Sequence, residues 1–478
     1  MTELTEYEKG CRMIDNHPAG LATSGLSWRE KISYGLGDMG FNFYWTNIAA
    51  FLMIFYTDVF GIKALTAGSM LFTIKLVNAF TDPVAAALAD RTRTRFGKFR
   101  PYLIWGALPL FGAGVLTYTT PNLDQDGKLI WAYGTYLLMM LCYTGINIPY
   151  NALSGVMSSD PKERTTINGL RFFFGFSGGT LVTAATPYLV KWLGGGDERL
   201  GWQLTMVIWG AAASCLFLVT FLNTRERIPP PAQKSPMLQD LKDLMHNGPW
   251  MVLFFLALII MMTITLRTST AAYYFKYFVK RPLLNAWFVP AYMVAAALGS
   301  LVMPVLTRFI DKKFLLMILM SITGFLSIAF FFIPEDGIVW MFALQILIGL
   351  VLGPKSALTF AMYADTADYT EWRTGRRATA MTFAAATFSQ KLGTALASVM
   401  MGSVFAALGY VANAEQTPES QTGIVLLISV IPAVFAFLAV GVMAFYKLDN
   451  RTLSQIEAEL AARKGAAAGT LPVEPKRN

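Results

Sequence analysis

Charged residues are scarce in this sequence. Asp, Glu, Lys and Arg make up 14% of its 478 residues, whereas hydrophobic residues make up 55%. A soluble domain of ordinary composition carries about 25% charged residues. These proportions therefore exclude an ordinary soluble domain and indicate an integral membrane protein.

Cysteine and histidine are also scarce, which limits the chemistry that the chain can perform. The three cysteines, Cys11, Cys142 and Cys215, are scattered without the spacing of a metal site or a disulfide framework. The two histidines, His17 and His246, lie outside the apolar stretches. Because these residues form no convincing catalytic constellation, we expect neither an enzyme nor a bound metal or cofactor.

What the sequence does contain is a series of long apolar stretches. Each is long enough to cross a hydrocarbon core of about 30 Å as a helix of about 20 residues. They predict an all-α membrane protein with about twelve transmembrane helices, at 33–57, 66–89, 101–119, 129–152, 169–193, 202–222, 249–278, 284–307, 314–334, 338–364, 378–409 and 421–446.

The longest polar interior stretch divides these spans into six and six. We therefore predict an N-terminal segment at 1–32, a six-helix bundle at 33–222, a central loop at 223–248, a second bundle at 249–446 and a tail at 447–478. Transporters built from two such bundles bind their substrate between the bundles, near the bilayer midplane.

Lysine and arginine gather before the first span and in the even-numbered loops. Because such loops stay in the cytoplasm, both termini and the central loop are predicted to be cytoplasmic. The exception is the group Lys276, Lys280 and Arg281 after the seventh span. The net charge of +9 is then explained by the positively charged residues of the cytoplasmic loops. We therefore expect no nucleic-acid partner. No cleavable secretory signal is visible in the first 32 residues.

The second predicted span carries three polar side chains on one face. Lys75, Asn78 and Asp82 are spaced i, i+3 and i+7. Charges inside membrane helices are costly and persist mainly along ion or substrate paths. We expect this stripe to be functional, although a structural pair of Lys75 with Asp82 is the alternative.

Polar residues also line the first and fourth spans. Asp38 and Asn42 are one turn apart, and Thr144, Asn147 and Asn151 form a stripe. We expect these faces to converge with that of Asp82. Amides beside aromatic side chains suit a polyhydroxylated ligand. The alternative is that the same residues hold helices together by hydrogen bonds.

The second half supplies mainly cations, namely Arg267, Lys355 and Lys391, with Gln390 beside the last. Together with Lys75 they outnumber the buried acids, which leads to the hypothesis of an anionic substrate such as a sugar acid. Snorkelling or pairing with unidentified carbonyls is the alternative.

Dense charge clusters mark the cytoplasmic ends of the second and tenth spans. We expect them to act as conformational gates between the halves. The residues are Asp90, Arg91, Arg95, Arg100, Asp365, Asp368, Glu371 and Arg376.

Several segments resemble the glycoside–pentoside–hexuronide:cation symporters, a branch of the major facilitator superfamily that includes melibiose permease. The segments lie in the family's order over most of the chain. They are 33–40 (SYGLGDMG), 56–61 (YTDVFG), 78–83 (NAFTDP), 90–101 (DRTRTRFGKFRP), 147–150 (NIPY), Arg164, 171–173 (RFF) and 365–371 (DTADYTE).

The resemblance implies a major facilitator fold and roles for four residues. Asp82 matches a cation-site aspartate and Thr144 a cation-site hydroxyl. Lys391 matches a lysine near both the cation and the sugar, and Arg171 an arginine near the sugar.

Four positions depart from melibiose permease. Asn78 replaces its second cation-site aspartate, Asn42 and Asn147 replace its sugar-binding aspartates, and Asn151 replaces a tryptophan. An amide carries no charge, so galactoside specificity is not inherited. The loss of one carboxylate matters more for Na⁺, which needs several oxygen ligands, than for H⁺. We therefore favour H⁺ over Na⁺.

We thus expect cation-coupled symport of a sugar, glycoside or hexuronide in a bacterial inner membrane. The expected roles are cation binding by Asp82, Asn78 and Thr144, substrate binding by Asn42, Asn147, Asn151, Arg171 and Tyr143, and coupling by Lys75, Lys391 and Asp38. A lysolipid or amphiphile carrier is the alternative transporter, and a membrane sensor or enzyme the alternative from another class. Oligomeric state stays open.

Overall fold

The computed structural model describes residues 25–158, 161–227, 242, 244–300, 302–375, 379–448 and 450–467. Most of these residues lie in helices, which confirms the prediction of an all-α protein. Much of the predicted N-terminal segment, central loop and tail lies outside the described residues.

The first half contains the elements that cover the first six predicted spans. They are α2 (Trp28–Ala50), α3 (Leu52–Ile54), η1 (Phe55–Val59), α4 (Ala64–Arg91), α5 (Pro101–Thr117), α6 (Gln125–Met157), α7 (Pro161–Gly194) and α8 (Glu198–Asn223). The first helix begins five residues before the apolar span because Ser27 and Glu30 form a reciprocal capping box.

The second half covers the other six spans. Its elements are α10 (Gly248–Tyr273), η2 (Tyr274–Phe278), η3 (Pro282–Leu284), α11 (Asn285–Ser300), α12 (Met303–Phe309), α13 (Lys312–Phe331), α14 (Ile338–Thr374), α15 (Thr379–Ala407), α16 (Pro418–Ile428) and α17 (Val430–Ala444), followed by α18 (Asn450–Ala467).

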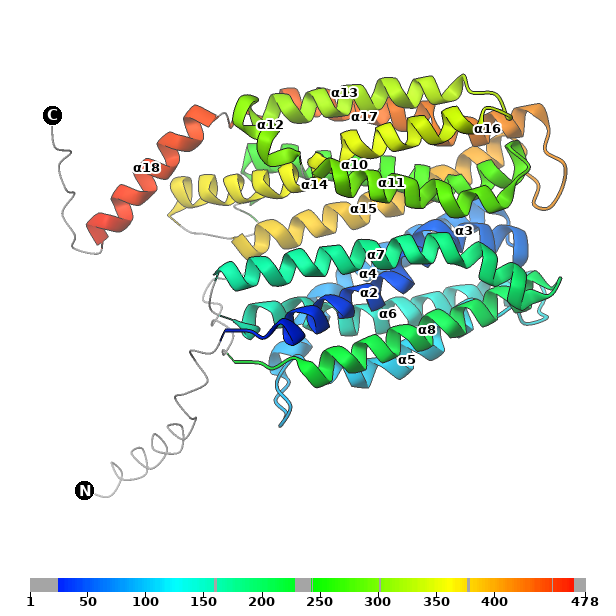
Figure 1. The fold of residues 1–478 in the computed structure, drawn as a ribbon, viewed down its shortest axis with the longest axis horizontal. Coiled ribbons are helices and arrows are strands. Elements are labelled where there is room, and N and C mark those ends of the chain that lie inside the picture. The colour runs from blue at the N-terminus through cyan, green and yellow to red at the C-terminus, as the bar shows by residue number, and fades with distance from the viewer. Residues whose placement is uncertain are drawn as a thin grey trace.

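The helices form two bundles that lie side by side (Figure 1). In the first, α2 packs against α7 and α8, and α5 against α6 and α8. In the second, α10 packs against α15 and α17, and α11 and α13 pack against α14. The bundles meet where α4 packs on α15 and α7 packs on α11. This interface is where the predicted site lies.

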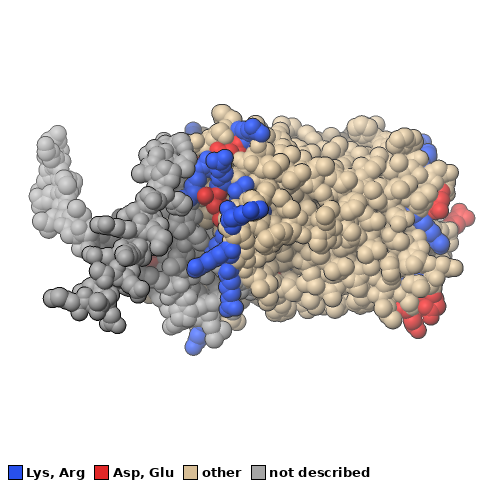
Figure 2. Space-filling view, turned by 90° about the horizontal axis from the view of Figure 1, so that it is seen from below, with Lys and Arg blue, Asp and Glu red and all other residues tan. Residues whose placement is uncertain are grey.

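The surface agrees with a membrane protein. Figure 2 shows a broad uncharged band, with acidic and basic side chains confined to the two ends of the molecule. Among the described residues, eight helical segments are long and apolar enough to cross a membrane. The total of twelve spans stays a prediction.

Two glycines allow α4 and α15 to cross closely. A Cβ atom on Gly68 would lie 2.5 Å from the Ser398 carbonyl oxygen, and one on Gly402 would lie 2.6 Å from the Ala64 carbonyl oxygen. Small residues at a helix crossing let the backbones approach each other. The bundles are therefore joined here by backbone contact.

The first helices of the two halves end in the same way. Both finish in a π-helical turn, η1 or η2, and a residue with positive φ follows each, Gly61 (φ 80°) or Lys280 (φ 58°). These equivalent ends bring Asp58 and Lys276 into contact, at the end of the molecule where α3 lies, opposite α18 (Figure 1).

Candidate functional site

Asp82 lies at the interface between the bundles, on α4. Its carboxylate contacts the Nζ of Lys391 on α15, and each side chain is 19% exposed. The same ammonium donates to Asn78 Oδ1 at 3.0 Å. This ion pair therefore connects a residue of the first bundle to one of the second.

A third helix, α6, completes this cluster. Thr144 Oγ1 donates to Asp82 Oδ1 at 3.4 Å and accepts from Asn78 Nδ2 at 2.6 Å, and Asn78 also donates to the Met140 carbonyl at 3.2 Å. The structure thus brings together Asp82, Asn78, Thr144 and Lys391. A cation that binds the carboxylate has to compete with Lys391 for it. Cation binding by these residues stays a prediction.

Lys75 does not join this cluster. Its Nζ donates to Ser398 Oγ at 2.9 Å and to the Thr394 carbonyl at 3.4 Å, both on α15. The alternative pair with Asp82 does not form, because seven residues separate the two by about 10 Å along the helix and Lys391 holds the carboxylate. Lys75 instead fixes α4 to α15.

A second ion pair lies within the first bundle. Arg171 Nε on α7 donates to Asp38 Oδ1 on α2 at 2.8 Å, and Asn42 Nδ2 donates to Asp38 Oδ2 at 3.3 Å. The Arg171 guanidinium also lies over the ring of Tyr150, 5.5 Å from its centre. Asp38 therefore neutralises the arginine that the family resemblance places near the sugar.

The amides of α6 lie along the same helix as Thr144. Asn151 Nδ2 donates to Asn147 Oδ1 at 3.0 Å, while Asn151 Oδ1 is buried and has no hydrogen-bond partner among the described residues. An unpaired buried oxygen is costly and suits a ligand that can donate to it. Tyr143 packs edge-on against Phe41, with ring centres 5.5 Å apart.

Tyr143 lies between the helices that carry the two ion pairs, Asp82–Lys391 and Asp38–Arg171. It is half-buried on α6, directly before Thr144, and its ring packs against Phe41 of α2, the helix that carries Asp38. The predicted cation-binding and substrate-binding residues of α2, α4, α6 and α7 thus lie in one region of the bundle interface.

The end of the molecule opposite α18 holds a cluster that the sequence analysis did not identify. We call it the outer cluster, because the distribution of positive charge predicts that this end faces away from the cytoplasm. Asp58 of η1 contacts Lys276 at 2.6 Å, Tyr277, and Tyr410, which follows α15. Asn413 donates to the Asp58 carbonyl and accepts from Lys276 at 2.8 Å. Thr57, on the same turn, also donates to Asp58 Oδ1 at 2.7 Å. The other four partners belong to the second bundle, so this outer cluster closes the interface at the end opposite α18.

One signal in the sequence could have revealed the outer cluster. Lys276 belongs to the group that departs from the distribution of positive charge. Asp58 occupies the equivalent helix end in the first half. An acid at that position can form an ion pair with Lys276. A local ion pair thus accounts for Lys276, one of the three cations in that group.

At the opposite end, the predicted gating residue Arg100 and the loop before it contact their own bundle. Glu226 accepts from the backbone amides of Lys98, Phe99 and Arg100 at 2.8, 2.8 and 3.0 Å. Arg100 Nη2 donates to the Phe221 carbonyl at 2.6 Å. Burial lowers the pKa of Arg100, and Glu226 opposes that shift.

The remaining gating residues are only partly described. Lys312 contacts Asp365 at 2.6 Å within the second bundle. Arg95 lies over the ring of Phe96, 4.6 Å from its centre, and Arg91 is exposed. Asp368 and Glu371 both make contacts. The Asp90 side chain and Arg376 lie outside the described residues, and the gating role stays a prediction.

Comparison with known proteins identifies the family. A family model described as "MFS/sugar transport protein" matches residues 33–450. The chain belongs to this family. This match confirms the family that the sequence motifs indicated and the major facilitator fold. The chain is therefore a multi-pass membrane transporter rather than an enzyme.

Individual members and structures agree with this family. The "Inner membrane symporter YicJ" of Escherichia coli K12 is 34% identical over 92% of this chain and 96% of its own length. The "Putative glycoside/cation symporter YagG" of the same strain is 34% identical over 94% and 98%. The fold matches that of a solved D-xylose–proton symporter, with a TM-score of 0.61, 14% identity and coverage of 88% and 99%.

Proposed function

We propose that this transporter couples the entry of a cation, H⁺ in preference to Na⁺, to the uptake of a sugar or glycoside. The names of YicJ and YagG, an inner membrane symporter and a putative glycoside/cation symporter, support this class of substrate and the inner membrane as location. The distribution of positive charge supports cytoplasmic termini.

The contact between Asp82 and Lys391 is the observation that carries the proposal. It joins α4 to α15 across the two bundles. A cation that takes the carboxylate releases the ammonium, so ion occupancy changes the contact between the bundles. A ligand shifts a conformational equilibrium only if it interacts differently with the two states, and this exchange of partners provides such a difference.

The coupling ion follows from the groups around Asp82. Its neighbours are an amide, a hydroxyl and an ammonium, so Asp82 is the one carboxylate among the described residues of this cluster. A proton needs a single titratable base, whereas Na⁺ needs several oxygen ligands. This composition supports H⁺, although Asn78 and Thr144 offer oxygen atoms that Na⁺ could use.

The sugar is proposed to bind beside this cluster. Asn42, Asn147 and Asn151 offer donors and acceptors for hydroxyl groups, and Tyr143 offers an aromatic wall for the C–H face of a sugar ring. Arg171 is held in place by Asp38. Coupling then requires that ion and sugar together favour the state that crosses the membrane.

The test is uptake by the reconstituted protein from a panel of neutral glycosides, pentosides and uronides, under separately imposed H⁺ and Na⁺ gradients. We expect uphill uptake with a H⁺ gradient, and its loss in Asp82→Asn while downhill exchange of sugar persists. Arg227→Gln, which breaks the ion pair with Glu30 within the first bundle, is the control and should retain coupling.

Uptake that follows a Na⁺ gradient and ignores H⁺ would contradict the choice of ion. Absence of flux for every sugar in the panel would contradict the substrate class.

A further inference from the structure

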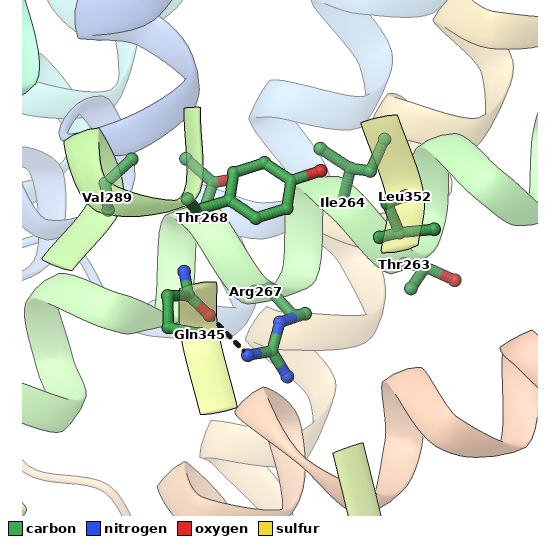
Figure 3. A pocket seen from close by; sticks show the side chains of 8 residues that line it. Thr263, Ile264, Arg267, Thr268, Val289, Gln345 and Leu352 are labelled. Atoms are coloured by element: carbon green, nitrogen blue, oxygen red, sulfur yellow. Dashed lines mark hydrogen bonds between the residues drawn. The ribbon is translucent and has the colours of Figure 1, made fainter. Parts of the chain in front are cut away.

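A small cavity with both polar and apolar lining residues lies inside the second bundle, between α10, α11 and α14 (Figure 3). Its volume is about 10 Å³, which is room for one water molecule or one small ion. The polar residues that line it are Thr263, Arg267, Thr268, Tyr292 and Gln345.

Arg267 is the charged residue of this cavity, and no carboxylate of the described residues pairs with it, although its guanidinium lies over the ring of Phe330, 5.4 Å from its centre. The residue is 6% exposed. Arginine keeps its proton in proteins, and an isolated buried charge is costly unless it is paired. A buried guanidinium without an acid therefore calls for an anion from another source.

Two of the guanidinium contacts have structural roles. Nη1 donates at 2.6 Å to the Ile428 carbonyl, at the break between α16 and α17. Pro432, four residues later, lacks the N–H that would bond this carbonyl in a continuous helix. Nη2 donates to Gln345 Oε1 at 2.6 Å (Figure 3), whereas Nε is buried without a partner.

The neighbours of Arg267 in the cavity carry groups that can donate hydrogen bonds, and the hydroxyls among them can also accept. Gln345 already uses Oε1 to accept from the arginine, which leaves its NH₂ group to donate. The hydroxyls of Thr268 and Tyr292 form no hydrogen bond within the described part of the chain. A cation surrounded by N–H and O–H donors, without a carboxylate, suits an anion and repels a metal ion.

The other cations near the interface differ from Arg267. Arg171 is paired with Asp38, and Lys391 with Asp82. Lys355 resembles Arg267, because it is 3% exposed and forms no ion pair within the described residues. The uncompensated charge is thus concentrated in the second bundle.

We propose that the cavity beside Arg267 binds a small anion. The anion is either an inorganic ion such as chloride or the acid group of a transported sugar acid. The sugar acid is a candidate only if the proposed function, sugar symport, is correct. In both cases the anion accepts from Arg267 Nε and from the donors of Thr268, Tyr292 and Gln345.

The test measures equilibrium binding of radioactive chloride and of labelled glucuronate to the purified full-length protein in lipid nanodiscs, without a gradient. We expect saturable binding of at least one of them, weaker by roughly tenfold or more in Arg267→Gln because a charge-assisted hydrogen bond is lost. Thr268→Val and Tyr292→Phe each remove one donor with little change in shape and should weaken binding less. Lys312→Gln is the control and should bind like wild type.

Glucuronate that displaces chloride, while glucose does not, would assign the site to the substrate's acid group. Chloride binding that glucuronate leaves unchanged would assign it to an inorganic anion. Absence of saturable binding of both, or unchanged binding in all three cavity variants, would overturn the proposal. Because binding is measured without transport, a failure of sugar symport would not imitate these outcomes.

Discussion

Replacing Asp58 with asparagine removes the carboxylate that joins the two bundles at their outer end. This carboxylate contacts Lys276, Tyr277 and Tyr410, all of the second bundle. An asparagine keeps the size of the side chain but carries no charge. The variant should therefore favour the state in which the outer end is open.

The size of this effect follows from the burial of the two partners. Removing one partner of a buried ion pair costs about 3–5 kcal/mol. Asp58 is 1% exposed, but Lys276 is 25% exposed, so solvent screens the lysine and we expect about 2 kcal/mol. Since about 1.4 kcal/mol corresponds to tenfold, the ratio of outer-open to outer-closed protein should rise about 30-fold.

The assay is the labelling of a single cysteine near the proposed substrate site. Asn147→Cys is introduced after the three native cysteines have been replaced by serine. Right-side-out vesicles are then treated with a membrane-impermeant maleimide. Asp58→Asn should increase the labelling rate by up to about 30-fold, the ratio worked out above, and the exchanged pair Asp58→Lys with Lys276→Asp should restore a slow rate.

Lys312→Gln provides the matched control, because it breaks an ion pair of similar length within the second bundle. An unchanged labelling rate in Asp58→Asn would refute the reasoning. An equal increase in Lys312→Gln would do so as well, since it would attribute the effect to general destabilisation.

Three further predictions concern other contacts. Lys391→Gln leaves the carboxylate of Asp82 without its competitor, so the ion concentration for half-maximal downhill uptake should fall about tenfold, whereas a rise would contradict competition. Gly68→Ala should lower the melting temperature because its Cβ would collide with α15, at a cost of about 1–3 kcal/mol, while Gly112→Ala, whose Cβ meets nothing within 4 Å, should not. The hydrogen bond from the Ser158 hydroxyl lowers the pKa of Glu163 below its ordinary 4.5, so the stability that it adds is complete above that pH and is lost as the pH falls through the lowered value. The difference in melting temperature between wild type and Glu163→Gln should therefore vanish in acid, and its persistence there would count against this linkage.

Helical periodicity and family motifs predicted much of the arrangement around Asp82. The i, i+3 and i+7 spacing correctly put Asn78 and Asp82 on one face, and the stripe of α6 put Thr144 opposite them. Periodicity identifies the polar face of a helix that is turned toward its neighbours. It says nothing about which residue on a distant helix fills the space in front of that face.

Lys75 and Asp58 show this limit. Lys75 lies on the predicted stripe, yet its partner Ser398 depends on where α15 crosses α4, and that crossing is decided by packing between segments more than 300 residues apart. The contacts of Asp58 likewise require two helix ends and a later loop to meet. Such contacts arise from the relative position of the two bundles, which no local pattern contains.

The close contact of Gly68 with Gly402 is a point about which one bundle can turn relative to the other. Asp82 lies 14 residues from Gly68 along α4, a distance of about 21 Å. If one bundle turns about the glycine contact by roughly 10°, a rotation of ordinary size for rigid bodies within proteins, the backbone at Asp82 moves by about 3–4 Å relative to α15. A displacement of that size exceeds the reach of a hydrogen bond, so a slight tilt at the crossing is enough to separate Asp82 from Lys391.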